Sequence, residues 1–244
     1  MGEVIAILSG KGGTGKTTIC AGVASALAIS GRKVLCIDCD VGLRNLDIAL
    51  GMSQEDALSF LEICRDGYSL DQAARHITFS DLYFLTAPVS EKAEDVDSAA
   101  FLELLTQARE KYDYIFLDAP AGMDAGFELS CKYADRVMLV TGADPAAVRD
   151  AARVGQELER KGKTDVRLVV NRVNKKTVSF MGWTVDDIMD NAGLPLLGVV
   201  PEDENVVLAA TFRIPLLTFT RRGAAKACKR IAKRLEGHTV AVKL

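Results

Sequence analysis

Short apolar runs and longer amphipathic segments alternate along the chain. The runs with the length of a buried strand are residues 4–8, 33–38, 82–85, 114–118, 136–141, 166–171 and 196–200. The segment 97–111 instead carries Phe101, Leu104, Leu105 and Ala108 at intervals that place them on one helix face. Because near-continuous apolar strands are typical of parallel sheets with both faces covered, the pattern predicts an α/β fold with a mostly parallel, twisted sheet between two layers of helices.

Helical spacing and helix-breaking residues place the helices between these strands. We predict helices over residues 19–29, 54–64, 70–75, 97–111, 145–160, 185–191 and 224–235, with a short tail at 237–244. The sequence contains no internal repeat, no low-complexity tract and no composition typical of an interdomain linker. A length of 244 residues suits one large α/β domain, so we expect residues 1–244 to form a single domain.

Composition limits the classes of protein that fit. The formal net charge of −3 argues against a surface that binds nucleic acid generally, and no apolar run approaches the roughly 20 residues that cross a bilayer. The 6 cysteines fit a reducing compartment, and we expect a cytoplasmic protein. Cys36 and Cys39 are spaced like half of a zinc site, but no second pair completes it, so we interpret them as small buried residues.

The chemistry of the chain centres on a glycine-rich stretch that joins the first strand to the first helix. It reads Gly10, Lys11, Gly12, Gly13, Thr14, Gly15, Lys16, Thr17 and Thr18. The stretch satisfies the phosphate-loop pattern G-x-x-x-x-G-K-[ST], in which glycines let backbone N–H groups converge on a polyphosphate. The following helix adds its N-terminal N–H groups. Lys16 supplies a positive charge for the outer phosphates, and the Thr17 hydroxyl is placed to ligate Mg²⁺.

Polar side chains follow other predicted strands as well. Asp38 and Asp40 follow the second strand, Asp118 ends the fourth, and Asn171 ends the sixth. Right-handed crossovers place the carboxyl ends of parallel strands at one edge of the sheet, beside the phosphate loop. We expect Asp118 to hold Mg²⁺ through water next to Thr17. We also expect a carboxylate in the loop after the second strand to position water or Mg²⁺ near the outer phosphate.

Two segments carry a resemblance to a known family. Residues 11–18 resemble the deviant Walker A motif of the MinD/ParA ATPases, in which a second lysine, here Lys11, lies inside the phosphate loop. Residues 38–47 are similar, almost residue for residue, to the segment that marks the MinD group within that family. Further similarities follow in chain order at residues 118–122, 148–150 and 198–203. Together these matches extend over nearly the whole chain.

The resemblance implies roles for individual residues. Lys16 and Thr17 would bind phosphate and Mg²⁺ in their own subunit, and Lys11 would reach the partner's nucleotide in a face-to-face ATP dimer. Asp40 would position the attacking water beside the metal, with Asp118 behind it. The adenine base would contact residues at two strand ends, namely Asn171, Arg172, Pro201, Glu202 and Asp203. For Asn171 a plain strand-end cap remains an alternative.

The same resemblance implies a function and partners. It implies a Mg²⁺-dependent ATPase that dimerises on ATP and hydrolyses it slowly, as a switch in placing the division septum. The implied partners are a second copy of the chain, a MinC-type inhibitor, a MinE-type or other positional protein, and an anionic surface at the inner face of the cell membrane. Three alternatives stay open: a ParA-type ATPase that binds DNA nonspecifically, a relative that positions flagella or cargo, and a metabolic kinase. Lys11 and the absence of an obvious lid insertion argue against the kinase.

The last predicted helix bears on the choice among these partners. This helix and the two residues close before it carry Arg221, Arg222, Lys226, Lys229, Arg230, Lys233 and Arg234. A basic amphipathic helix can lie on an anionic membrane, but we interpret its apolar face, with Ile231 and Leu235, as packed on the domain. The tail at 237–244 is β-branched and lacks bulky residues between lysines, so we expect it to be a poor membrane anchor.

Overall fold

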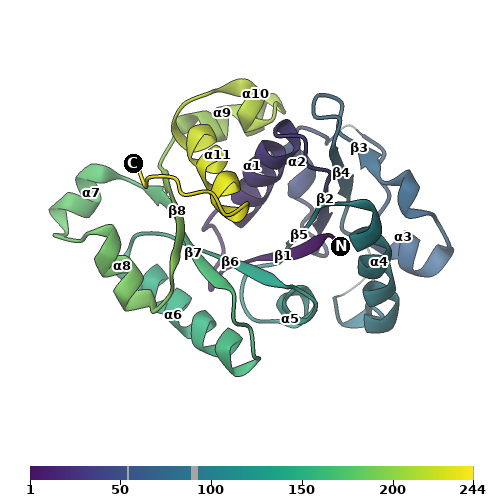
Figure 1. Cartoon of the computed structure of the whole chain (residues 1–244), viewed down its shortest axis with the longest axis horizontal. Helices are drawn as coiled ribbons and strands as arrows, with labels where there is room; N and C mark the ends of the chain where they lie inside the picture. The colour runs from purple at the N-terminus through teal and green to yellow at the C-terminus, as the bar shows by residue number, and fades with distance from the viewer. Residues whose placement is uncertain (54, 89–92, 244) are drawn as a thin grey trace.

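The structure is a computed structural model that describes residues 1–53, 55–88 and 93–243 (Figure 1). Its strands are β1 (Glu3–Leu8), β2 (Val34–Asp38), β3 (Ala74–Arg75), β4 (Leu82–Leu85), β5 (Tyr114–Asp118), β6 (Arg136–Thr141), β7 (Val166–Val173) and β8 (Leu196–Pro201). Its α-helices are α1 (Lys16–Ile29), α2 (Leu46–Leu50), α3 (Phe60–Asp66), α4 (Ser98–Lys111), α5 (Ala125–Lys132), α6 (Pro145–Arg160), α7 (Lys175–Phe180), α8 (Val185–Ala192), α9 (Glu204–Phe212), α10 (Leu216–Phe219) and α11 (Gly223–Leu235). Short 3₁₀ helices lie at η1 (Leu70–Gln72) and η2 (Ala93–Asp95).

These strands form one sheet in the order β3-β4-β2-β5-β1-β6-β7-β8. Neighbouring strands are parallel throughout, except that β3 runs antiparallel to β4. In the central register Asp38 of β2 lies beside Asp118 of β5, which in turn lies beside Ile7 of β1. The carboxyl ends of the strands therefore meet at one edge, and the predicted α/β class with a mostly parallel sheet is confirmed.

Each face of the sheet has its own hydrophobic core. Ile5 and Ile7 of β1 pack in the core that lies beneath α1 and α11, whereas the alternate residues of the same strand pack in the core that includes α4, α5 and α6. Figure 1 shows α1, α9, α10 and α11 gathered on one side of the central strands and α5, α6 and α8 on the other. Cys36 and Cys39 are both buried and belong to different cores, and all the cysteines are free, which confirms their interpretation as small buried residues.

The last helix packs on the domain through its apolar face, as the sequence predicts. Ile231, Cys228 and Leu235 are buried in the core shared with α1 and β8. The contact with β8 is close, because a Cβ atom at Gly198 would lie only 2.4 Å from Cγ1 of Ile231. In the part of the chain that the structure describes, no helix is both long and apolar enough to cross a membrane.

Shortening Ile231 tests the packing of α11. Ile231→Ala should lower the free energy of unfolding by about 3 kcal/mol, because it opens a cavity between helix and sheet that a close-packed core fills poorly. Lys226→Ala on the exposed side of the same helix should change it by less than about 0.5 kcal/mol. Urea denaturation of both variants measures the difference, and equal losses would contradict the packing described here.

The structure corrects two of the predicted helices. The helix predicted over residues 54–64 is α3, which begins only at Phe60, because the Ser59 hydroxyl accepts from the backbone N–H of Glu62 and caps it there. Residue 54 itself lies outside the described residues. The helix predicted over 70–75 is instead the single turn η1, followed by the edge strand β3. Pairing of β3 with β4 takes up the backbone groups that a longer helix would have used.

Candidate functional site

The phosphate loop curls between β1 and α1 and is held by a side chain from a distant strand. Gly13 and Gly15 adopt positive φ angles of 77° and 88°. The amide Nδ2 of Asn171, near the end of β7, donates to the Thr14 carbonyl oxygen over 2.8 Å. A Cβ atom at Gly15 would lie 2.3 Å from that nitrogen, so glycine is required there for both conformation and space. Asn171 therefore braces the loop, a contact that neither the base-binding nor the strand-cap interpretation predicts.

Lys16 and Thr17 open α1 at the rim of the loop. Because Gly15 is the N-cap residue, the first-turn N–H groups of α1 are directed out of the helix toward the loop. Lys16 is buried although it carries a charge. Burial lowers the pKa of Lys16, while the nearby carboxylates of Asp118 and Asp40 act in the opposite direction. Two acids therefore lie close enough to this lysine to influence its charge.

Asp118, at the end of β5, is a buried acid of the site. Burial, with a further contribution from the charge of Asp38, raises the pKa of Asp118 to about 8, and a hydrogen bond with Thr17 opposes the shift. Its Oδ1 atom is buried and has no hydrogen-bond partner among the described residues. A buried carboxylate oxygen without a partner is costly unless a ligand meets it. Its position beside the Thr17 hydroxyl fits Mg²⁺, whose remaining ligands are commonly phosphate oxygens and water.

The two acids after β2 have different environments. Asp38 is fully buried; its Oδ1 accepts from the Asp40 N–H over 2.9 Å and its Oδ2 from the Leu46 N–H over 3.2 Å. Burial raises the pKa of Asp38 to about 6, and these backbone hydrogen bonds oppose the rise. Asp40 is half-buried; burial raises its pKa, and the charge of Lys16 opposes the shift. Asp38 thus fixes the loop between β2 and α2, which leaves Asp40 as the acid that faces the phosphate loop.

A cavity of about 380 Å³ opens beside the loop, where a nucleotide base can be held. Arg172 has a positive φ of 54°, and its guanidinium donates to the Gly13 carbonyl oxygen over 3.4 Å and pairs with Glu202 over 3.8 Å. The amide of Asn174 also donates to Glu202, over 3.3 Å. The cavity is lined by loop residues and by residues from β7, α7 and the end of β8, namely Lys11, Gly12, Gly13, Thr14, Gly142, Ala143, Asp144, Asn171, Arg172, Asn174, Thr177, Val178, Met181 and Glu202.

Not all residues predicted to contact the base line this cavity. Asp203 accepts from the backbone N–H groups of Asn205 and Ala224, so its carboxylate caps α9 and joins the starts of α9 and α11. Pro201 ends β8 next to Glu202 but is not among the lining residues. Sequence reasoning missed the lining residues on α7, because they contribute a short helix whose apolar positions are too few to show a period.

Lys11 lies at the outer edge of the loop and points to α6. Its Nζ lies 3.4 Å from Oδ1 of Asp144, the N-cap residue of α6, and both side chains are about half exposed. Exposed ion pairs of this kind contribute little free energy, so Lys11 is free to exchange this partner for another anion.

Comparisons with known proteins agree with this geometry. The family described as the CobQ/CobB/MinD/ParA nucleotide binding domain matches residues 5–216. The septum site-determining protein MinD of Synechocystis sp. is 35% identical over 243 residues, covering 98% of this chain and 91% of that protein. The MinC:MinD cell division protein complex of Aquifex aeolicus contains a chain with a TM-score of 0.88 and 32% identity, covering 99% of this chain and 98% of that one. MinD of Pyrococcus horikoshii complexed with Mg-ADP gives a TM-score of 0.85 and 28% identity, covering 97% of this chain and 96% of that one.

Proposed function

Because this chain belongs to the MinD group of the CobQ/CobB/MinD/ParA nucleotide-binding family, we propose that it is an ATPase that dimerises on Mg²⁺-ATP and acts as a switch in placing the division septum. The observation that carries the proposal is the pair of lysines in one phosphate loop, one buried and one about half exposed. Lys16 is buried beside Asp118 and Asp40, whereas Lys11 extends from the rim of the loop. The buried lysine serves the chain's own nucleotide, and the half-exposed lysine is available to another subunit.

In this proposal the loop binds and orients ATP before hydrolysis. Backbone N–H groups at the start of α1 and the charge of Lys16 hold the phosphates. Thr17 and Asp118 would hold Mg²⁺, which supplies positive charge to the phosphate oxygens when bound. Asp40 accepts a hydrogen bond from the attacking water and orients it toward the terminal phosphorus. The water oxygen forms a bond to that phosphorus as the bond between the phosphorus and the ADP oxygen breaks, and a proton of the water passes to a phosphate oxygen, which gives ADP and inorganic phosphate. Asn171 holds the loop in place while the cavity beside Arg172 and Glu202 receives the base.

Dimerisation makes this chemistry a switch. Lys11 would leave Asp144 and approach the terminal phosphate bound by the partner subunit. ATP carries more negative charge than ADP at that point, so the attraction across the interface is stronger with ATP and weakens after hydrolysis. Hydrolysis therefore limits the lifetime of the dimer. This arrangement favours the proposed switch over a metabolic kinase, whose reaction needs an acceptor pocket rather than a second subunit.

Lys11→Ala tests the role across the interface. The variant should keep ATP affinity within about threefold, because the remaining loop still binds the nucleotide. It should lose the ATP-dependent dimer, as expected when a charge that contacts phosphate from the second subunit is removed. Light scattering during size-exclusion chromatography in Mg²⁺-ATP measures the change. Lys132→Ala, an exposed lysine at the end of α5, serves as the control. A Lys11→Ala protein that still dimerises with ATP would exclude the role in trans.

The partners follow from the same switch. The Aquifex aeolicus structure holds MinD with MinC, and we propose a MinC-type partner for the ATP dimer of this chain. A MinE-type or other positional protein would then stimulate hydrolysis. We further propose that the dimer is recruited peripherally to an anionic membrane at the inner face of the cell membrane. Nonspecific binding to DNA, as in a ParA-type ATPase, is the alternative for this recruitment.

A further inference from the structure

Helix α9 carries an exposed apolar face that no other element covers among the described residues. Val207, Leu208, Phe212 and Ile214, here called the α9 ridge, are 69%, 43%, 62% and 37% exposed. Leu208 and Phe212, four residues apart, lie on one face of the helix, and Val207 lies beside them, so the three span an arc of roughly 140°. Ile214 lies just beyond the C-terminal end of α9. Ala209 is buried beneath them. Other large exposed apolar residues of the described chain, such as Phe180 and Ile77, lie on different elements.

The ridge is held in position by the element that follows it. The ring of Phe212 stacks on Phe219 of α10, with centroids 6.2 Å apart and planes inclined by 20°. Phe219 is half-buried and packs against the core beneath α1. The exposed apolar side chains are thus held at the surface by a helix. Side chains on a loop could instead fold inward. A contiguous exposed apolar patch on a soluble fold marks a surface that meets another apolar phase.

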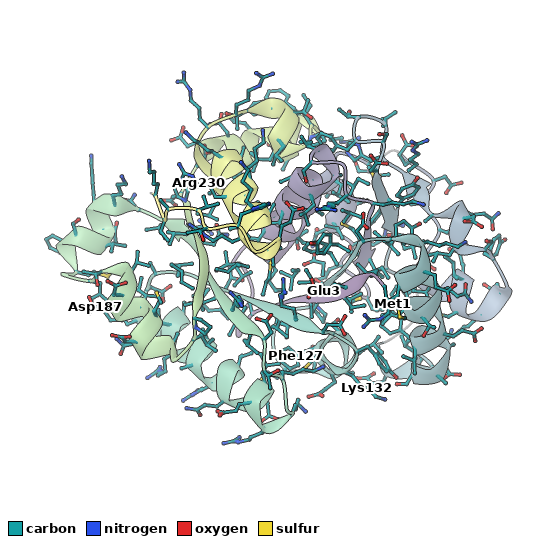
Figure 2. All side chains as sticks on the ribbon, viewed as in Figure 1. Met1, Glu3, Phe127, Lys132, Asp187 and Arg230 are labelled. Atoms are coloured by element: carbon teal, nitrogen blue, oxygen red, sulfur yellow. The ribbon has the colours of Figure 1, made fainter. Side chains whose placement is uncertain are left out.

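Cations border the ridge. Arg213 follows Phe212 directly, Arg221 and Arg222 directly precede α11, and Lys226 lies in its first turn; all four are exposed. Between Glu204 and Glu236 the sequence holds 8 basic residues and no acidic residue, in a chain whose formal net charge is −3. Glu204, in the first turn of α9, is the acid nearest the ridge along the chain. Figure 1 shows α9, α10 and α11 together in one part of the molecule, and Arg230, labelled in Figure 2, lies on α11 in that group.

The shape of the surface decides between kinds of partner. The hollow between α9 and α1 has a volume of only about 40 Å³, and Ile214 is the one ridge residue that lines it, so Val207, Leu208 and Phe212 project outward rather than into this hollow. A ridge without a groove suits a deformable apolar phase that the ridge itself enters. The phosphates of anionic lipids complement the surrounding cations, and juxtaposed cations and apolar residues are typical of helices that lie in a membrane interface. Duplex DNA would pair with the cations but leaves the apolar ridge in water.

Neither α11 nor the tail offers an equivalent apolar surface. The apolar face of α11 is buried against α1 and β8. The tail runs back along this helix: Arg234 donates to the Val240 carbonyl oxygen over 2.8 Å, and Arg230 to that of Lys243 over 2.9 Å. These elements therefore contribute charge, while the apolar area comes from α9.

We propose that the α9 ridge, with Arg213, Arg221, Arg222 and Lys226 around it, is a docking surface that inserts into the headgroup region of an anionic phospholipid bilayer. The inference rests on the proposed function for the ATP dependence of vesicle binding. Two ridges joined in an ATP dimer bind one vesicle more tightly than a single ridge does. The location of the surface does not depend on ATP, since the ridge is exposed in the single chain.

Vesicle flotation tests the surface with the full chain. The vesicles are phosphatidylcholine alone and phosphatidylcholine with phosphatidylglycerol, in Mg²⁺-ATP and in Mg²⁺-ADP at physiological salt. Val207→Ser combined with Phe212→Ser should lower the partition coefficient on anionic vesicles at least about tenfold, because apolar area no longer enters the bilayer. Arg221→Ser combined with Arg222→Ser should lower it by a similar factor. Phe180→Ser removes an even more exposed aromatic ring from α7 and should leave binding unchanged.

A second readout reports insertion directly. The tryptophan fluorescence of Phe212→Trp should be quenched by brominated lipid, whereas that of Phe180→Trp should not, each measured against the wild-type signal of Trp183.

Ridge variants that hydrolyse ATP normally and float like wild type would overturn the proposal. So would a wild-type chain that binds a fluorescent duplex DNA but floats with neither vesicle. Light scattering keeps the two proposals apart: a dimer that forms in ATP without floating refutes only the ridge. A chain that floats through the ridge but never dimerises refutes only the switch.

Discussion

Lys16→Ala should abolish nucleotide binding, with ATP affinity lowered by at least about 10²-fold. Lys16 is a buried cation at the start of α1, and its charge lies near Asp118 and Asp40. Without this charge, the phosphates of ATP would lie next to two carboxylates with no cation to offset the repulsion. In a partly desolvated site the loss of one such charge costs several kcal/mol. We therefore expect this substitution to have the largest effect on binding in the molecule.

Isothermal titration with Mg²⁺-ATP measures this effect. Lys132→Ala again serves as the control, because that lysine is exposed and lies at the far end of α5. Circular dichroism establishes that the Lys16→Ala chain is folded. A folded Lys16→Ala protein that binds ATP as wild type does would remove the phosphate-loop assignment.

Asp40→Ala should stop turnover while ATP still binds, so that the ATP dimer persists. Asp40 is half-buried and faces Lys16, whereas neighbouring Asp38 uses both carboxylate oxygens to hold the backbone. Loss of a group that orients the attacking water commonly lowers the rate by about 10²- to 10⁴-fold. Because hydrolysis ends the dimer, a slower reaction lengthens its lifetime by a comparable factor.

Phosphate release and dimer lifetime are the two measurements for Asp40→Ala. Asp56→Ala, which removes an exposed carboxylate from the next connection, between α2 and α3, should change neither. Asp38→Ala should act differently, because it should destabilise the fold of the loop and weaken binding as well. Unchanged turnover in Asp40→Ala would take this residue out of the proposed mechanism.

The sheet could be predicted from the sequence because its strands carry their own signal. Residues 114–118 form an apolar run that is buried on both faces, and the structure places β5 there in the middle of the sheet. The amphipathic helix predicted over 145–160 matches α6 at both ends, since Asp144 caps it and Pro145 occupies its first turn. Strong local signals and burial agree at these positions, so local reasoning was sufficient.

Four of the short helices could not be predicted in the same way, although α8 was. α2, α5, α7 and α10 span only four to eight residues, too few turns for a hydrophobic period to appear. α9 is a different case, because its apolar residues resemble core positions and only the tertiary structure shows that Val207 and Phe212 face outward. The hydrophobic pattern of a sequence indicates which residues share a helix face, but it does not show what covers that face.

In the candidate site, too, some features could be predicted from local sequence and others depend on the tertiary structure. The spacing of the phosphate loop placed Lys16 and Thr17, and the strand ends placed Asp118 and Asp40, because parallel topology brings these ends together. The brace from Asn171 to Thr14 could not be predicted, since it joins residues 157 positions apart through a single hydrogen bond. The caps formed by Asp203 could not be predicted either. This residue was predicted to contact the adenine base, but its carboxylate joins the starts of α9 and α11.

Sedimentation velocity of the purified chain tests the central claim most directly. The chain is measured with Mg²⁺-ATP and with Mg²⁺-ADP at equal protein concentration, before ATP is exhausted. We predict a dimer of the 26.3 kDa chain in ATP that is lost in ADP. A monomer in both nucleotides, or the same dimer in both, would contradict an ATP-driven dimerisation switch.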